Sequence, residues 1–482
     1  MPARPLTAAS AARVATLLGS AVQRSPAYLG LADGLRLLVS DGRLPTGTRL
    51  PSERDLTTAL GVSRTTVTRA YAVLRERGYL ESRRGSRSVT RLPAPRGGGA
   101  QDHLLSPGSP EGDVLDLTVA APVAPAGVAA AYERALEQLP AYLSGTGYFP
   151  SGLPVLREAL ADRFTARGLP TSADQVVVTS GALAGVAMTA RALTSTGDRV
   201  LAESPTYPNA IATWRRSGAR LVGVGVEPDG WDLDAMTAAL RQVSPRAAYL
   251  VPDFHNPTGS LMDDEQRARL GHALARARTT AVVDETLVEI ALDDVTMPSP
   301  LAVHEPGAVT VGSASKAFWG GLRIGWVRAP LDQVGGLVAA RLSLDLGAAA
   351  LEQLTLVELL RDAEAVARTR RERLVASRAA LIAGLHEHLP DWTFVVPAGG
   401  LALWCRLPEP LSSSLAVAAE REGVLVAPGP TFAPEGGFER FVRLPYTRSP
   451  DELTEATRRL ARAWADARRH RGNAAARSPL VA

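Results

Sequence analysis

The chain has 482 residues, of which 46% are hydrophobic and 21% charged, and these proportions are those of a folded globular protein. No apolar run is long enough to cross a bilayer, and the N-terminus lacks the apolar core and cleavage site of a secretory signal. The single cysteine, Cys405, excludes an internal disulfide, and its apolar neighbours at 401–405 predict a buried strand. We therefore expect a cytoplasmic protein with more than one folding unit.

The net charge of +4 hides an asymmetry between the two ends of the chain. Residues 1–92 carry 15 arginines and 6 acidic residues, a net charge of +9, which leaves −5 for the remainder. A basic segment at one end of an acidic body is typical of a protein that binds nucleic acid through that end. The alternative is a basic surface that serves only solubility.

Composition divides the chain into successive stretches. Residues 1–28 form an alanine-rich N-terminal extension, and residues 29–92 form the basic unit. Residues 93–113 are rich in proline, glycine and serine, which is the composition of a flexible linker. Residues 114–468 form a large domain, and residues 469–482 form a C-terminal tail.

The basic unit contains three segments with helical patterns. Leucines recur at helical spacing over 31–38 and predict the first helix. Ser52 can cap the N-terminus of a second helix, which ends near Gly61, and Ser63 can cap a third. The third helix has an outward-facing polar start and an apolar stripe that consists of Val67, Ala70, Tyr71 and Leu74. This pattern predicts a helix-turn-helix whose last helix enters the major groove by its N-terminal end.

Two short segments follow the third helix, at 80–82 and 86–91. They can pair as a hairpin, and such a wing reaches phosphates or the minor groove with its tip. The unit resembles the winged helix-turn-helix of the GntR regulator family, most clearly at 50–56 and 61–67. The resemblance implies that DNA is contacted by Arg54, Ser63, Arg64, Thr65, Arg84 and Gly85. The alternative is a three-helix module that mediates another interaction.

The large domain alternates short apolar runs with helical segments. Continuous apolar runs separated by helices predict the strands of a mostly parallel sheet that is covered on both faces. In such sheets ligands bind beyond the carboxyl ends of the strands. The runs lie at 176–178, 200–202, 221–226, 247–251, 281–283, 309–311 and 325–327.

Lys316 is the single lysine among 53 basic residues. A primary amine can condense with an aldehyde, whereas a guanidinium cannot, because it never gives up its proton. Lys316 follows a predicted strand and is suited to form a Schiff base with pyridoxal 5′-phosphate. The cofactor phosphate would then bind near Ser313, Ser315 and Arg323. The alternative is a surface lysine retained by chance.

Polar residues also follow other predicted strands. Asp284 ends a strand and can keep the ring nitrogen of the cofactor protonated. Asn256 can donate to its phenolic oxygen, and Tyr207 can stack on its ring. Each of these signals alone is common in turns and helix caps, and we assign no metal ligand. The phosphate can also be bound by backbone N–H groups at the start of a helix, at Ser180, Gly181 and Ala182.

Taken in order, these motifs resemble the fold type I aminotransferases over residues 114–468. The resemblance implies an α/β transferase fold with a mostly parallel sheet, a smaller C-terminal α+β subdomain, and pyridoxal 5′-phosphate as cofactor. It also implies that Arg443 holds the carboxylate of the ligand and that Tyr148 reaches the phosphate of the partner subunit. The family usually has a tyrosine two or three residues after the aspartate, where this chain has Thr286 and Leu287. Whether the site turns over a substrate therefore stays open.

A GntR-like head joined by a linker to an aminotransferase-like body resembles the MocR group of regulators. The resemblance implies a homodimeric transcription regulator that binds operator DNA, with heads that can be swapped over the partner's body. Its body would sense an amine, an amino acid or the cofactor itself, and the ligand would favour one arrangement of the heads. Two alternatives remain: a working aminotransferase that carries a DNA-binding domain, and a DNA-binding protein whose large domain is only a dimerisation scaffold.

Overall fold

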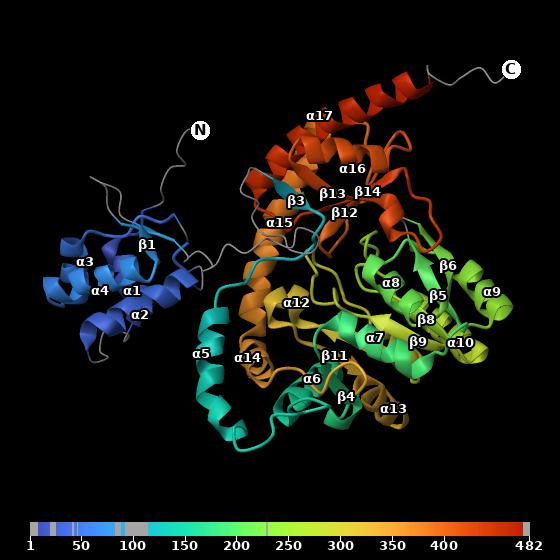
Figure 1. Cartoon of the computed structure of the whole chain (residues 1–482), viewed down its shortest axis with the longest axis horizontal. Coiled ribbons are helices and arrows are strands. Elements are labelled where there is room, and N and C mark those ends of the chain that lie inside the picture. Colours follow the sequence, from blue (N-terminus) through green and yellow to red (C-terminus); the bar gives the residue numbers. More distant parts are fainter. Residues whose placement is uncertain are drawn as a thin grey trace. The chain divides into compact units, whose positions relative to one another are not determined.

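The computed structural model describes residues 8–19, 26–40, 43–45, 47–81, 88–91, 114–227 and 230–475 (Figure 1). The chain separates into two compact units, Met1–Ser106 with Ala124–Arg134 and Pro107–Val123 with Ala135–Ala482. Within the described ranges, we find no helix with the length and hydrophobicity that a membrane span requires.

The smaller unit is a cluster of helices with a two-stranded antiparallel sheet. The predicted apolar stripe of the third helix is buried in its core. The N-terminal extension also contributes to this core, because Val14 and Leu18 of α1 are buried among the same side chains. The boundary expected at residue 28 therefore cuts through one hydrophobic core. The elements are α1 (Ala11–Leu18), α2 (Ala27–Ser40), α3 (Glu53–Leu60), α4 (Arg64–Glu76), β1 (Leu80–Glu81) and β2 (Val89–Thr90).

The predicted helix starts and the paired base of the predicted wing are present. Ser52 Oγ accepts a hydrogen bond from Asp55 N at 3.2 Å, and Ser63 Oγ accepts one from Thr66 N at 3.1 Å. Gly61 ends α3 in the left-handed region, with φ 65°, where glycine carries no steric penalty. β1 and β2 pair antiparallel as the base of the wing. The tip, with Arg84 and Gly85, lies outside the described residues.

The larger unit is organised around an eight-stranded sheet of order β4-β11-β10-β9-β8-β5-β6-β7. The five strands from β10 to β6 run parallel in the order β10-β9-β8-β5-β6. β11 is antiparallel to both neighbours, because only the short segment 314–324 joins it to β10, too little for a crossover. The strands are β4 (Val176–Thr179), β5 (Arg199–Ser204), β6 (Arg220–Glu227), β7 (Gly230–Trp231), β8 (Ala247–Leu250), β9 (Thr280–Asp284), β10 (Val309–Ser313) and β11 (Gly325–Arg328).

Helices cover both faces of this sheet, as the continuous apolar runs predicted. Alternate residues of one strand enter different cores, so that Val282 packs on one face and Val283 on the other. The first face is covered by α7 (Ala182–Leu193), α8 (Pro208–Arg216) and α13 (Leu331–Arg341). The second is covered by α6 (Pro154–Ala166), α9 (Leu233–Val243), α10 (Asp264–Ala277) and α11 (Leu301–His304). The segment between β10 and β11 carries α12 (Ala314–Ala317) and η4 (Gly320–Leu322).

A second sheet of order β12-β14-β13-β3 forms the expected smaller subdomain. It packs with three helices around one core, and the buried Cys405 of β12 belongs to that core. The strands are β3 (Leu115–Leu117), β12 (Ala402–Arg406), β13 (Val424–Pro428) and β14 (Phe441–Pro445), and the helices are α15 (Ala363–His388), α16 (Ser412–Arg421) and α17 (Pro450–Ala475). α17 extends past residue 468, where we expected the tail to begin.

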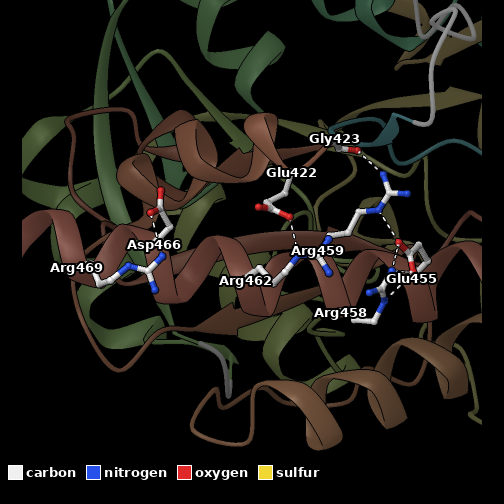
Figure 2. A network of polar contacts seen from close by, with 8 residues as sticks. All are labelled: Glu422, Gly423, Glu455, Arg458, Arg459, Arg462, Asp466 and Arg469. Carbon is white, nitrogen blue, oxygen red and sulfur yellow. Dashed lines mark hydrogen bonds and ion pairs between the residues drawn. The ribbon is translucent and has the colours of Figure 1, made fainter.

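Ion pairs fasten α17 to the end of α16 (Figure 2). Arg462 Nε lies 2.6 Å from Glu422 Oε2, and Arg421 Nη1 lies 3.6 Å from Asp466 Oδ2. Within α17 itself, Arg459 Nε donates to Glu455 Oε1 at 2.7 Å. α5 (Val128–Gln138) begins in the smaller unit and ends in the larger one. The remaining elements of the larger unit are η2 (Leu139–Tyr142), η3 (Ala173–Gln175), α14 (Ala350–Arg361) and η5 (Gly429–Phe432).

Candidate functional site

A cavity of about 360 Å³ lies within the larger unit, at the carboxyl ends of the parallel strands. One part of its wall follows β8, β9 and β10, and another part belongs to the smaller subdomain and to the segment 118–121 after β3. Nine residues that the sequence predicted as ligands line it together: Ala182, Tyr207, Asn256, Asp284, Ser313, Ser315, Lys316, Arg323 and Arg443.

Lys316 reaches the cavity from the single turn of α12, directly after β10. Its Nζ donates a hydrogen bond to the carbonyl oxygen of Ala120 at 2.8 Å. Burial, reinforced by the nearby cation of Arg443, lowers the pKa of this amine to about 8, although Asp284 opposes the shift. A larger fraction of Lys316 is therefore unprotonated near neutral pH than of an ordinary lysine, and only the unprotonated amine is a nucleophile.

Asp284 is buried at the end of β9, and both of its carboxylate oxygens accept hydrogen bonds. Tyr249 donates to Oδ2 at 2.6 Å, and the backbone N–H of Thr286 donates to Oδ1 at 2.9 Å. Burial raises the pKa of Asp284, and the two donors oppose that rise. The carboxylate is thus placed to face a cationic group in the cavity.

The start of α7 and the side chain of Arg323 form a cradle at one end of the cavity. Gly181 has φ 101°, and a Cβ at this position would lie 2.6 Å from Arg323 Nη2. Arg323 Nη2 donates to the carbonyl of Ser180 at 3.1 Å, so the guanidinium is held against the helix start. The hydroxyls of Ser313 and Ser315 are 3.0 Å apart. Backbone N–H groups, hydroxyls and a guanidinium are the donors that bind a phosphate.

Arg443 of β14 brings a second cation into the cavity. Its Nη1 donates to Asn256 Oδ1 at 3.3 Å, its Nη2 donates to the carbonyl of Thr118, and the guanidinium lies over the Phe432 ring at 4.9 Å. Burial lowers the pKa of Arg443 to about 10. Its Nε is buried and has no hydrogen-bond partner within the described part of the chain.

Three predicted site residues do not line the cavity. Ser180 and Gly181 adjoin it through Arg323, whereas Tyr148 is 63% exposed and is not among the lining residues. Sequence reasoning missed Tyr249, which stands next to Asp284. Its signal was a lone polar side chain within the otherwise apolar run 247–251.

Among the described residues, no cluster of three or more His, Cys, Asp or Glu side chains is arranged to hold a metal ion.

Comparison with protein families identifies both parts of the chain. Residues 113–460 match the family described as aminotransferase class I and II. The chain belongs to this family. Residues 27–89 match the gntR family of bacterial regulatory proteins, so the chain joins a GntR-type DNA-binding domain to an aminotransferase domain, the architecture of the MocR group.

The similar proteins include both an aminotransferase and a transcription regulator. The 2-aminoadipate transaminase of Thermus thermophilus is 32% identical over 308 residues, which cover 62% of this chain and 78% of that protein. The Rhizobium meliloti protein named probable rhizopine catabolism regulatory protein MocR is 29% identical over 429 residues, or 84% of this chain and 86% of that protein.

A solved structure supports the same fold. The α-aminoadipate aminotransferase LysN from Thermus thermophilus, complexed with N-(5′-phosphopyridoxyl)-L-leucine, has a TM-score of 0.67 and 29% identity, covering 74% of this chain and 93% of LysN.

The cavity of this chain fits pyridoxal 5′-phosphate, the cofactor of the family. A nucleophilic amine, a buried carboxylate and a cradle that a Cβ would fill stand in one cavity. These groups match the aldehyde, the ring nitrogen and the phosphate of that cofactor.

Proposed function

We propose that this protein is a transcription regulator whose aminotransferase domain senses an amine or amino acid through pyridoxal 5′-phosphate bound at Lys316. The observation that carries the proposal is the cavity, which is lined by Lys316, Asp284 and Arg443 together. The same chain also has a GntR-type DNA-binding domain. A scaffold that served only dimerisation would not need these groups in one place.

Each side chain of the cavity has one task in this proposal. When bound, the cofactor supplies an aldehyde for amines and a ring that withdraws electrons. Lys316 provides the amine that anchors it, and Asp284 holds a proton on the ring nitrogen. Asn256 donates to the phenolic oxygen, and Tyr207 covers the ring. The phosphate is bound by backbone N–H groups and side chains of Ser180, Gly181, Ala182, Ser313, Ser315 and Arg323.

Arg443 favours a ligand that carries a carboxylate. Its guanidinium is buried, lies over Phe432 and belongs to the cavity wall, and a guanidinium can bind a carboxylate through two N–H groups. An amino acid carries both the amine for the cofactor and the carboxylate for Arg443. We therefore place amino acids ahead of simple amines as effectors.

Thr286 and Leu287 favour a sensor over an enzyme. Both residues line the cavity, where aminotransferases usually have a tyrosine that contacts the cofactor. Without that phenol, the site retains the groups that capture a ligand and lacks one that tunes turnover. A working aminotransferase is the second candidate, because the transaminase of Thermus thermophilus is 32% identical to this chain.

We further propose that the protein acts as a homodimer. Leu143 and Tyr148 expose 69% and 63% of their surface, and exposed leucines also follow α13 at 342, 344 and 346. The backbone of Phe149 lies against Gly347, so the two segments adjoin. A second copy would cover them and bring its Tyr148 to the phosphate cradle.

The first experiment is reductive trapping in the full-length protein. Because Lys316 is the single lysine of the chain, borohydride reduction after loading with pyridoxal 5′-phosphate should add the cofactor mass to one peptide. Lys316→Arg keeps the charge and should prevent trapping. Failure of the wild-type protein to show a visible band or a trapped peptide would support the scaffold alternative.

The second experiment separates sensor from enzyme. An amino-acid library is added to the loaded protein, while the spectrum and the affinity for a DNA duplex selected from random sequences are measured. A spectral shift with altered DNA affinity and no turnover supports the sensor. Repeated conversion with an oxo-acid acceptor, at unchanged DNA affinity, supports the aminotransferase instead.

A further inference from the structure

Tyr249 is a buried phenol in the middle of β8. Its strand neighbours are alanines and a leucine, and its side chain is fully buried in the core beneath α7 and α8. A buried hydroxyl without a partner is unfavourable, so its partner is informative. That partner is Asp284 Oδ2, at 2.6 Å.

The register of the sheet explains how the two side chains meet. Tyr249 lies opposite Val282 in the parallel pair β8–β9, and Asp284 follows two residues later on the same face. Two residues of strand span about 6.6 Å, a distance that the long tyrosine side chain bridges. Serine or threonine at this position would be too short to reach the carboxylate.

The surroundings of Asp284 favour its protonated form, and a hydrogen-bond donor to the carboxylate opposes this effect. Burial raises the pKa of Asp284, and the buried Glu203 on β5 raises it further. Among the groups that lower the pKa of Asp284, Tyr249 has the largest effect and Thr286 follows. The other titratable groups that face Asp284 are Tyr207 and the cation of Lys316. A phenol that donates to the carboxylate stabilises the ionised form.

We propose that Tyr249 is a positioning residue that keeps Asp284 a carboxylate, so that the proton between Asp284 and the cofactor remains on the ring nitrogen. The inference rests on the proposed function, in which Asp284 faces that nitrogen. Oδ2 accepts a hydrogen bond from the phenol, and Oδ1 accepts one from Thr286 N. Each oxygen retains a second lone pair that can accept another hydrogen bond. Without the phenol, the carboxylate becomes more basic and takes the proton from the ring.

The test uses full-length protein loaded with pyridoxal 5′-phosphate labelled with ¹⁵N in the ring, because the NMR shift of that nitrogen reports its protonation directly. Tyr249→Phe removes only the hydroxyl and should move the signal toward that of an unprotonated ring. Asp284→Asn provides the unprotonated reference. The matched control is Tyr446→Phe, which removes another buried phenol, one that donates to the carbonyl of Gly399 at 3.1 Å outside the cavity lining.

Cofactor affinity gives a second readout. A hydrogen bond to a charged group contributes enough that its loss should weaken binding by about tenfold. Tyr446→Phe should leave both the ¹⁵N signal and the affinity unchanged. If Tyr249→Phe unfolds in thermal scans where Tyr446→Phe does not, Tyr249→3-fluorotyrosine keeps the shape and strengthens the donor, so the ring nitrogen should stay protonated to a higher pH than in the wild type.

The outcomes separate two kinds of failure. A wild-type protein that shows no visible band and no trapped cofactor contradicts the proposed function itself. A wild-type protein that binds the cofactor overturns the role of Tyr249 if its ¹⁵N signal is the same in Tyr249→Phe, or if fluorination leaves unchanged the pH at which the ring nitrogen loses its proton. Either result leaves the proposed function intact.

Discussion

Lys316 Nζ lies 2.8 Å from the carbonyl oxygen of Ala120, in a cavity that also holds the guanidinium of Arg443. Burial and then the Arg443 cation lower the pKa of the Lys316 amine to about 8. Because only the unprotonated amine attacks an aldehyde, attachment of pyridoxal 5′-phosphate to the apoprotein should accelerate as the pH rises toward 8 and then level off.

Stopped-flow absorbance at a series of pH values measures this dependence. Arg443→Gln removes a cation that lowers the pKa, so its curve should rise at higher pH than that of the wild type. The exposed Arg440 offers a matched control, and Arg440→Gln should reproduce the wild-type curve. A rate that climbs steadily through pH 10 would show that the amine has an ordinary pKa.

Gly181→Ala should weaken cofactor binding. The residue has φ 101°, and its new Cβ would lie 2.6 Å from Arg323 Nη2, so both the backbone and the phosphate cradle would be disturbed. A non-glycine residue in such a conformation costs about 1–3 kcal/mol. We expect a dissociation constant at least tenfold higher, measured by spectral titration. Gly225→Ala is the control, because its Cβ would meet no atom within 4 Å. Equal cofactor affinities in the two variants would exclude the cradle as the phosphate site.

The ion pairs of α17 predict a pH-dependent contribution to stability. Hydrogen bonds from Arg458 and then Arg459 hold the pKa of Glu455 below its usual value (Figure 2). A depressed pKa means that the carboxylate stabilises the fold above the unfolded-state pKa and loses this effect as the pH falls through the folded-state pKa. Since the carboxyl is largely solvated, Glu455→Gln should cost no more than about 1 kcal/mol at pH 7.

Urea unfolding of wild type and Glu455→Gln at several pH values tests this prediction. The difference in unfolding free energy should shrink to nothing in acid, where both chains carry a neutral group. The exposed Glu420 of α16 is the comparison residue, and Glu420→Gln should behave as the wild type throughout. A difference that persists in acid would assign the effect to packing rather than charge.

Much of this fold follows from local signals. The apolar runs predicted the strands of the large sheet because strands buried on both faces need apolar side chains on both. Ser52 and Ser63 predicted helix starts because a side-chain acceptor at the N-cap pairs with a free backbone N–H. Lys316 and Asp284 could be placed at one edge because parallel strands end together.

The features that the sequence did not predict depend on contacts between distant residues. Val14 and Leu18 belong to the core of the smaller unit. With Leu17 they stand at helical spacing, but this spacing does not specify the residues against which they pack. Tyr249 reaches Asp284 through the register of β8 and β9, which no single strand specifies. The antiparallel direction of β11 follows from the short segment that carries Lys316, a constraint already present in the spacing of the predicted runs at 309–311 and 325–327.

Arg64→Ala should separate DNA binding from cofactor binding. Arg64 begins α4 and is exposed, next to the exposed Ser63 and Thr65, while the hydrogen bond from Thr68 to Glu53 at 2.6 Å fixes α4 against α3. An arginine at the start of a recognition helix typically contributes about 1–3 kcal/mol of specific binding.

Fluorescence anisotropy with a selected duplex measures the loss, and the visible spectrum of the loaded protein should not change. Arg13 of α1 is exposed in the same unit, so Arg13→Ala tests whether removing any positive charge has the same effect. Equal losses in the two variants would mean that the head attracts DNA only through its net charge. A larger loss in Arg64→Ala, confined to the selected sequence, is what a recognition helix requires.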